Sequence, residues 1–301
     1  LVSITLLGSV AQLISDKLCE IGDEQFHQDF QSSLLLLLQN SSLSPKSLSN
    51  VSFIISRYSK IYYPNWPSLL ENLFQIIQSS NHPSFAIDCI SYCISNGSIV
   101  FDDQILQTLI QLIQSILDSI PDLIPQFLSA MKLLFTLYQC DSIDETFKSN
   151  LKIFSEKIVG VNIDSSDQDL HDRYMIELSN FADENIDFFE PSLGSLVDLL
   201  GAKICSQQFS ENVENSSVLV LKYIFCNKKY TNEFQSKSIE VYDLLVRLIS
   251  TKLPEAEIDP DEGENALNEI NIIANAKDAI KSIAHNYGGF DDVSIYLITS
   301  F

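Results

Sequence analysis

Glycine is scarce in this sequence, with 9 residues among 301. Because glycine supplies the tight turns of phosphate-binding loops and of turn-rich β-folds, its scarcity argues against nucleotide-binding loops and β-sandwiches. Basic residues are also few: 18 Lys and Arg stand against 40 Asp and Glu, so the net charge is −22. A field of this sign repels phosphate backbones, so we expect no direct nucleic-acid contact and favour basic protein partners.

Long hydrophobic runs are missing as well. The densest run, Leu34 to Leu38, is five residues long, whereas a membrane-spanning helix needs about 20, so we expect no membrane insertion. The first residues, Leu1 to Ile4, lack a starting Met and a basic stretch, which suggests a segment of a longer protein rather than a signal peptide. The six cysteines are dispersed through apolar stretches and predict reduced, buried thiols in an intracellular protein.

What the sequence does contain is helical periodicity. Hydrophobic residues make up 46% of the chain, enough for a sizeable core, and stretches such as Val51, Ile54, Ile55 and Tyr58 follow the spacing of one helix face. No convincing run of strict alternation occurs, so the chain is predicted to be all-α. Prolines and glycines divide it into helices predicted at 1–20, 24–40, 46–62, 67–80, 82–95, 102–120, 122–140, 143–160, 167–185, 190–208, 211–230, 232–252, 265–287 and 290–301.

These helices pair as about seven hairpins with a spacing of roughly 40 residues, which is the period of HEAT and armadillo repeats. One hairpin cannot bury its apolar face alone, so neighbouring hairpins are expected to stack into a superhelical α-solenoid. Residues 1–301 are then a single HEAT-repeat segment of a longer chain. The alternative all-α arrangement is a globular bundle of many helices.

One segment, residues 253–264, interrupts the helical pattern. It holds Pro260, Gly263 and a dense group of carboxylates, which predicts a solvated acidic loop inside a hairpin. Two interpretations stay open: a loop that only adds solubility, or a docking element that attracts a Lys- and Arg-rich partner. The candidate partner-binding residues are Glu255, Glu257, Asp259, Asp261, Glu262 and Glu264.

Side chains that could carry out catalysis do not converge in the sequence. The four histidines are isolated, and Cys89 and Cys93 share a helix face without a second Cys or His pair at matching spacing. We therefore predict no catalytic residue, no metal site and no cofactor, and do not expect an enzyme. An all-α enzyme would need a pocket of titratable groups around His171 or around the Cys89–Cys93 face.

Two further features have structural explanations. The neighbouring acids Asp102 and Asp103 stand at a predicted helix start, where the helix dipole favours negative charge. Trp66 precedes Pro67, which opens a predicted helix, so we expect this indole to fill a hairpin core.

Three stretches resemble the importin-β (karyopherin-β) superfamily. In residues 51–70, a first helix ends near Trp66-Pro67, which opens the second helix of a repeat. Residues 175–191 resemble the helix, aromatic-x-Pro, helix pattern of the large importins that carry ribosomal proteins and histones. The acidic segment is followed by residues 273–289, similar to the small-residue helix ending in Gly-Gly in that branch.

The resemblance implies a nuclear transport receptor that shuttles between cytoplasm and nucleus as a monomer. Its concave surface would hold basic protein cargo, Phe-Gly nucleoporins would enter apolar grooves between outer helices, and Ran-GTP would displace the cargo. The acidic segment is the implied contact for cargo or Ran. The alternative function is a HEAT-repeat scaffold or regulatory subunit of phosphatase, coat-adaptor or ubiquitin-ligase type.

Overall fold

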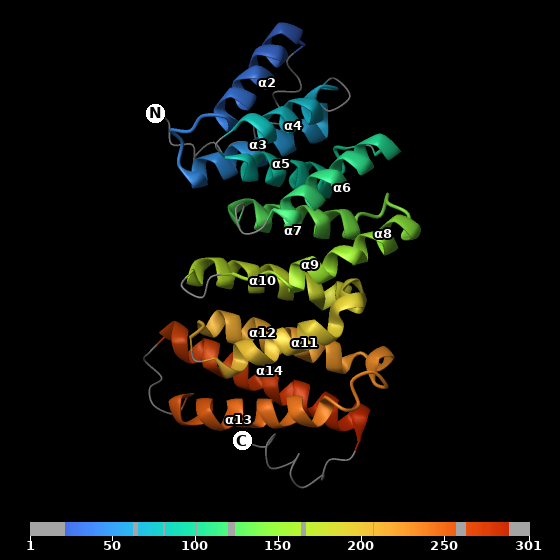
Figure 1. Ribbon diagram of the computed structural model, residues 1–301. Helices are drawn as coiled ribbons and strands as arrows, with labels where there is room; N and C mark the ends of the chain where they lie inside the picture. The colour runs from blue at the N-terminus through green and yellow to red at the C-terminus, as the bar shows by residue number, and fades with distance from the viewer. Residues whose placement is uncertain are drawn as a thin grey trace. The chain divides into compact units, whose positions relative to one another are not determined.

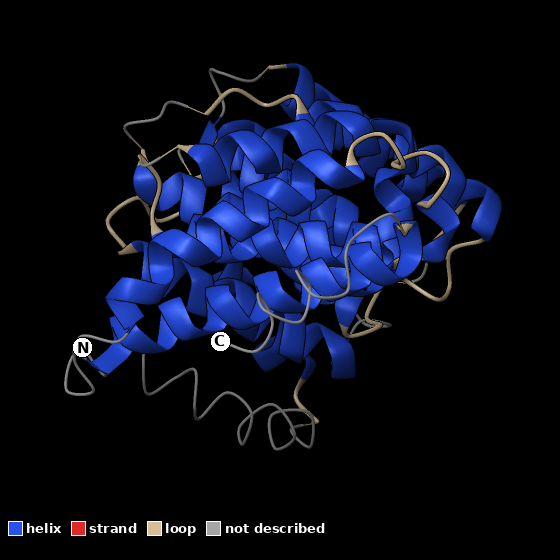
Figure 2. Cartoon of the chain, turned by 90° about the horizontal axis from the view of Figure 1, so that it is seen from below, coloured by secondary structure: helices blue, strands red, loops and turns tan. Residues whose placement is uncertain are grey.

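The computed structural model describes residues 22–62, 66–80, 82–99, 101–119, 124–163, 167–206, 208–256 and 263–288. These residues form helices joined by turns and loops, and none of them lies in a strand (Figure 2). The prediction of an all-α chain is therefore confirmed. The chain divides into two compact units, of which the first ends at Leu151 and the second begins at Lys152.

The helices of each unit follow one another along the chain in Figure 1. Those of the first unit are α2 (Glu24–Leu38), α3 (Pro45–Tyr62), α4 (Leu69–Ser79), α5 (Pro83–Ser95), α6 (Asp103–Asp118), α7 (Ile124–Gln139) and α8 (Glu145–Leu151). Those of the second are the 3-10 helix η2 (Lys152–Phe154), α9 (Ser155–Val159), α10 (Gln168–Asn185), η3 (Ile186–Ser192), α11 (Leu193–Cys205), α12 (Glu211–Cys226), η4 (Lys228–Tyr230), α13 (Ser238–Ala256) and α14 (Gly263–Tyr287).

Most predicted helices recur with small shifts at their ends. Aspartates cap the starts of two of them: the Asp102 carboxylate, expected at a helix start, accepts a hydrogen bond from the Ile105 N–H (2.7 Å), and Asp167 accepts one from the Leu170 N–H (3.0 Å). The helices predicted at 1–20 and 290–301 lie outside the described residues.

Two predicted helices were wrong in detail. Residues 143–160 form α8, η2 and α9 instead of one helix, because η2 packs against η3, a distant segment that local periodicity does not encode. The helix predicted from residue 232 begins only at Ser238. The turn before it brings Phe234 into the core, where its ring lies 5.8 Å from that of Phe225, so tertiary packing sets this boundary.

Within each unit, every second helix stacks on the next of its kind. In the first unit α3 contacts α5 and α5 contacts α7, while α2, α4 and α6 each pack on the helix that follows. In the second unit α10, α12 and α14 stack in the same way, with α11 packed on α12 and α13 on α14. The stacked helices α3, α5 and α7 begin about 40 residues apart, the spacing expected of helical repeats.

The pairing of helices differs from the expected one at Trp66. The resemblance places α3 and α4 in one hairpin, but α3 packs on α2 and α5, and α4 packs on α5. Trp66 and Pro67 therefore connect two successive hairpins. The indole is buried, with 2% of its surface exposed, and meets Tyr58 edge-on at 5.8 Å, so its predicted packing role is confirmed.

Polar side chains connect successive stacked helices at the spacing of one repeat. Between α3 and α5, the Asn96 amide donates to the Ser56 carbonyl (2.7 Å) and the Ser52 hydroxyl donates to the Phe85 carbonyl (2.8 Å). Between α12 and α14, the Asn286 amide donates to the Phe225 carbonyl (2.9 Å). The Asn286 amide bonds a carbonyl in the last turn of α12, which has no partner within its own helix, and all three bonds fix the register between neighbouring helices.

The cysteines correct one expectation. Cys89 and Cys93 are buried, but Cys140 is half-buried and Cys205 and Cys226 are exposed, all as free thiols. The exposed pair lies at or beside helix ends, where the apolar stripe of the helix no longer faces the core. Cys19 lies outside the described residues.

Candidate functional site

The acidic segment connects α13 to α14, two helices that pack on each other. Glu255 belongs to the last turn of α13 and Glu264 to the first turn of α14, while Glu257, Asp259, Asp261 and Glu262 lie outside the described residues. The loop predicted over 253–264 is therefore shorter than expected, because both of its ends are helical.

Elementary helix energetics explains the two helical ends. Leu253, Glu255 and Ala256 have high helix propensity, and Pro254 removes only one backbone donor within the last turn of α13. At the other end, α14 begins at Gly263, so Glu264 lies in its first turn. The segment thus starts and finishes on packed helices.

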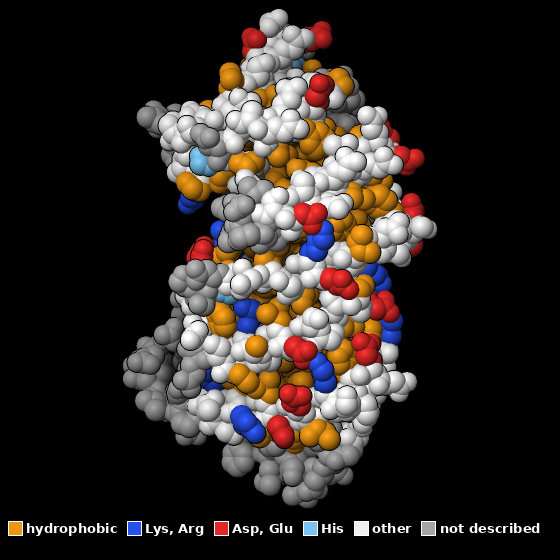
Figure 3. Space-filling view, viewed as in Figure 1, with side chains coloured by type: hydrophobic (Ala, Val, Ile, Leu, Met, Phe, Trp, Pro, Cys, Tyr) orange, Lys and Arg blue, Asp and Glu red, His pale blue; other side chains and the backbone are white. Residues whose placement is uncertain are grey.

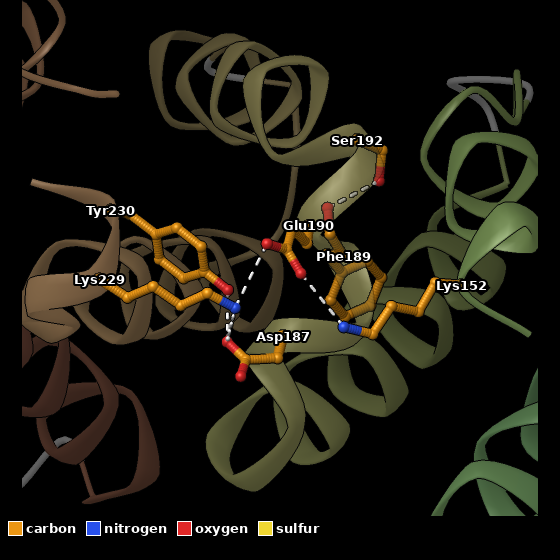
Figure 4. Close-up of polar contacts among 7 residues, drawn as sticks. All are labelled: Lys152, Asp187, Phe189, Glu190, Ser192, Lys229 and Tyr230. Carbon is orange, nitrogen blue, oxygen red and sulfur yellow. Dashed lines mark hydrogen bonds and ion pairs between the residues drawn. The ribbon is translucent and has the colours of Figure 1, made fainter. Parts of the chain in front are cut away.

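A second polar group, which the sequence did not predict, lies where three 3-10 helices meet (Figure 4). Glu190 of η3 accepts a hydrogen bond from the Lys152 ammonium of η2 (3.2 Å) and forms an ion pair with Lys229 of η4 (3.3 Å). Lys229 also lies 3.5 Å from Asp187, which accepts a hydrogen bond from the Tyr230 hydroxyl. We call these five residues the η-cluster.

The charges of the η-cluster stabilise one another. The hydrogen bond from Lys152, helped by Lys229, lowers the pKa of the Glu190 carboxyl. Burial and then the Asp187 carboxylate raise the pKa of Tyr230, which keeps its hydroxyl protonated as a donor. Each charged group of the η-cluster has a partner of opposite charge. The cluster therefore fits a structural role, in which it holds the ends of successive hairpins together, better than a catalytic one. Residues of opposite charge about one repeat apart were the signal that could have found it.

His171, one of the side chains singled out for a possible pocket, lies beside a buried lysine. A hydrogen bond joins Lys203 Nζ to His171 Nδ1 (3.1 Å), and the ammonium lies over the Phe209 ring, 4.2 Å from its centroid. Lys203 is only 5% exposed, and this desolvation lowers its pKa from 10.5 to about 8. Local sequence patterns do not predict this contact, because His171 comes from α10, Lys203 from α11 and Phe209 from the connection between α11 and α12.

The Cys89–Cys93 face is closed to solvent. Both thiols are buried, Cys93 lies 3.4 Å from the Ser59 hydroxyl, and burial raises the pKa of Cys89 well above its usual range. Burial therefore keeps the Cys89 thiol protonated, which makes it a poor nucleophile and a poor metal ligand. Among the described residues, no group of three or more His, Cys, Asp or Glu is placed to hold a metal ion.

The first unit carries a groove lined by uncharged side chains. Its volume is about 510 Å³, and it lies where α4, α5 and α6 meet. The lining is aliphatic and aromatic at its base, with Gln and Ser at its edges: Phe74, Ile77, Gln78, Pro83, Ile87, Thr108, Gln111, Leu112, Ser115, Ile116 and Gln126. Such a surface suits an apolar side chain of a partner rather than a charged one.

The second unit carries a groove of a different character between α11 and α13, about 490 Å³ in volume. Its floor is small and aliphatic, from Val197 and Gly201 on α11 and Leu244 on α13, and its edges carry charged side chains. Past Cys205 and Arg247 it continues into a second hollow of about 580 Å³. We call the two hollows together the α11–α13 groove. Figure 3 shows one face of the molecule, on which hydrophobic side chains lie exposed between acidic and basic ones.

No described helix has the length and hydrophobicity needed to cross a membrane. No protein-family model matches the chain, and no curated protein matches it significantly. Among solved structures, the chain is similar to the crystal structure of an engineered protein, a target of the Northeast Structural Genomics Consortium. The two share 14% sequence identity over 85% of this chain and 97% of the engineered one, with a TM-score of 0.49. An identity and a TM-score this low say nothing about the function of the chain.

Proposed function

We propose that this chain is a segment of a nuclear transport receptor of importin-β type. It is a non-catalytic α-solenoid that binds basic protein cargo and releases the cargo when Ran-GTP binds. It works in both cytoplasm and nucleus. The observation that carries the proposal is the repeated stacking of every second helix, at about 40-residue spacing in the first unit, in a chain of net charge −22.

The basic cargo binds at the acidic segment, residues 253–264. Six carboxylates between the ends of α13 and α14 attract Lys- and Arg-rich surfaces over a Debye length of about 8 Å and then form charge-assisted contacts. Packed helices at both ends of the segment reduce the conformational entropy that it loses on binding.

The uncharged groove of the first unit supports a role for Phe-Gly nucleoporins. A phenyl ring entering it meets the side chains of Phe74, Ile87 and Leu112 without desolvating a charge. Hydrophobic contacts of this kind are individually weak and exchange quickly, which suits a receptor that must pass through a meshwork of such repeats.

The first experiment is a pull-down of the chain, within its full natural protein, against Ran loaded with GTP or with GDP. Preference for the GTP form is expected. Equal or absent binding would refute the transport function and leave the alternative, a HEAT-repeat scaffold or regulatory subunit of phosphatase, coat-adaptor or ubiquitin-ligase type.

A second experiment tests the cargo contact with core histones as the basic probe. The variant Glu255→Gln, Glu257→Gln, Asp259→Asn, Asp261→Asn, Glu262→Gln and Glu264→Gln is expected to bind about tenfold more weakly and with a flatter salt dependence. The matched control neutralises six exposed acids of the first unit, Glu24, Asp29, Glu71, Asp103, Asp118 and Asp141. Equal losses in both variants would mean that net charge, and not the acidic segment, holds the probe.

A further inference from the structure

The α11–α13 groove contains a glycine that folding does not require. Gly201 lies inside α11, where glycine is less favourable than alanine because its backbone loses more conformational freedom. Its backbone has no left-handed conformation, and an added Cβ would meet only the Leu244 side chain, at an ordinary contact distance of 3.8 Å. Neither strain nor crowding explains the glycine. Gly201 lies at the floor of the groove, where a large side chain would fill the space that glycine or alanine leaves open.

The charges along the groove are not evenly compensated. At one end the Lys237 ammonium donates to Asp198, and at the other Lys252 forms an ion pair with Glu214 (3.3 Å). Between them, Glu240 and Asp243 stand three residues apart on the exposed side of α13. Neither forms an ion pair with another described residue, so their carboxylates are available to a ligand.

Arg247 restricts which cation can bind. It lies one helical turn beyond Asp243 and lines both hollows of the groove. A ligand with a single positive charge gains from Glu240 and Asp243 and keeps away from Arg247, whereas a run of positive charges along the groove meets like charge there. Beyond Arg247 the apolar side chains of Ile204 and Leu248 line the groove, and the charged side chains there include the ion-paired Lys252 and Glu214.

We propose that the α11–α13 groove binds an extended peptide segment of a partner protein. The segment places one Lys or Arg side chain at Glu240 and Asp243, and aliphatic side chains at alternate positions over Gly201 and Leu244. From Glu240 to Thr251 the lining residues of α13 cover about 16 Å, the length of about five extended residues. This inference rests on the proposed function, because the peptide belongs to a basic partner protein. The peptide site in the α11–α13 groove is separate from the acidic segment.

The test uses a fluorescein-labelled peptide, Ser-Arg-Ser-Leu-Ser-Val-Ser, in which Arg, Leu and Val share one side of an extended chain. Fluorescence anisotropy is measured against the whole chain. The variant Gly201→Leu fills the groove without changing its charge, and Gly201→Ala is its matched control, because a single methyl group leaves the groove open. Circular dichroism and thermal unfolding check that both variants fold.

We expect the peptide to bind the wild type and Gly201→Ala alike, and Gly201→Leu at least tenfold more weakly. The double variant Glu240→Gln, Asp243→Asn is expected to lose affinity by a similar factor, whereas Glu24→Gln, Asp29→Asn, which removes two acids from α2, changes little. A peptide with Glu in place of Arg is expected not to bind.

Three results would overturn the inference. The first is unchanged binding to Gly201→Leu, and the second is no binding of the peptide to the wild type. The third is loss of binding when the acidic segment is neutralised but not when the groove is altered, which would move the site to that segment. None of the three refutes the proposed function, since the Ran and histone experiments test it separately.

Discussion

Replacing Lys203 with Met tests whether the structure places an ammonium group in a costly environment. Lys203 is 5% exposed, and desolvation lowers its pKa from 10.5 to about 8. Methionine has a similar shape and length and carries no charge, so Lys203→Met removes the desolvation penalty while filling the same space.

The magnitude follows from the pKa shift. A change from 10.5 to about 8 corresponds to a penalty of about 3 kcal/mol on the folded state below pH 8. Loss of the Lys203–His171 hydrogen bond offsets about 1 kcal/mol of the gain. We therefore expect Lys203→Met to raise the free energy of unfolding by about 2 kcal/mol at pH 7.

The sign of the pH dependence is fixed by the same shift. Because the folded-state pKa is depressed, the unfolded chain binds more protons between pH 8 and pH 10.5, so the wild type gains stability as the pH rises through this window. The advantage of Lys203→Met should then shrink by about 2 kcal/mol between pH 7 and pH 10.

Urea unfolding of both proteins at pH 7 and pH 10 measures this difference. Lys228→Met, which replaces an exposed lysine, is the control and should leave the difference between the two pH values unchanged. A variant that is less stable than the wild type at pH 7, or an advantage that does not shrink at pH 10, would refute the reasoning. Either result would mean that the Phe209 ring and His171 stabilise the charged form more than burial disfavours it.

Three further changes follow from the contacts. Asn96→Ala removes the amide that donates to the Ser56 carbonyl and should lower the free energy of unfolding by about 1–2 kcal/mol in urea titrations; no change would mean that water replaces the amide. Glu190→Gln should cost less than about 1 kcal/mol by the same measurement, because its ion pairs in the η-cluster are partly exposed, and a larger loss would make the cluster a major support. Gly201→Ala should raise the melting temperature, since it adds helix propensity at up to about 1 kcal/mol; a decrease would show that the glycine is needed for packing.

Most of the secondary structure could be predicted from the sequence, except where tertiary contacts broke or shortened a helix, as at residues 143–160 and 232–237. Apolar residues at helical spacing, with capping residues such as Asp102 and Asp167 at the starts, are local signals, because a helix forms its backbone hydrogen bonds within four residues along the chain. The burial of Trp66 was also predictable, because a large aromatic side chain just before an apolar helix contributes much buried area when it packs against the neighbouring helices. The acidic segment was also identified, although its helical ends were not.

Tertiary structure alone decided which helices pair and which polar groups meet. The placement of α4 on α5, and not on α3, depends on where each apolar stripe points after the connecting turn, and a change of one residue in that turn rotates the stripe by about 100°. The same holds for the η-cluster and for Lys203 beside His171, whose members come from segments far apart in the sequence. The groove beside Gly201 exists only because α11 and α13 lie next to each other, a relation between surfaces that helical periodicity does not specify.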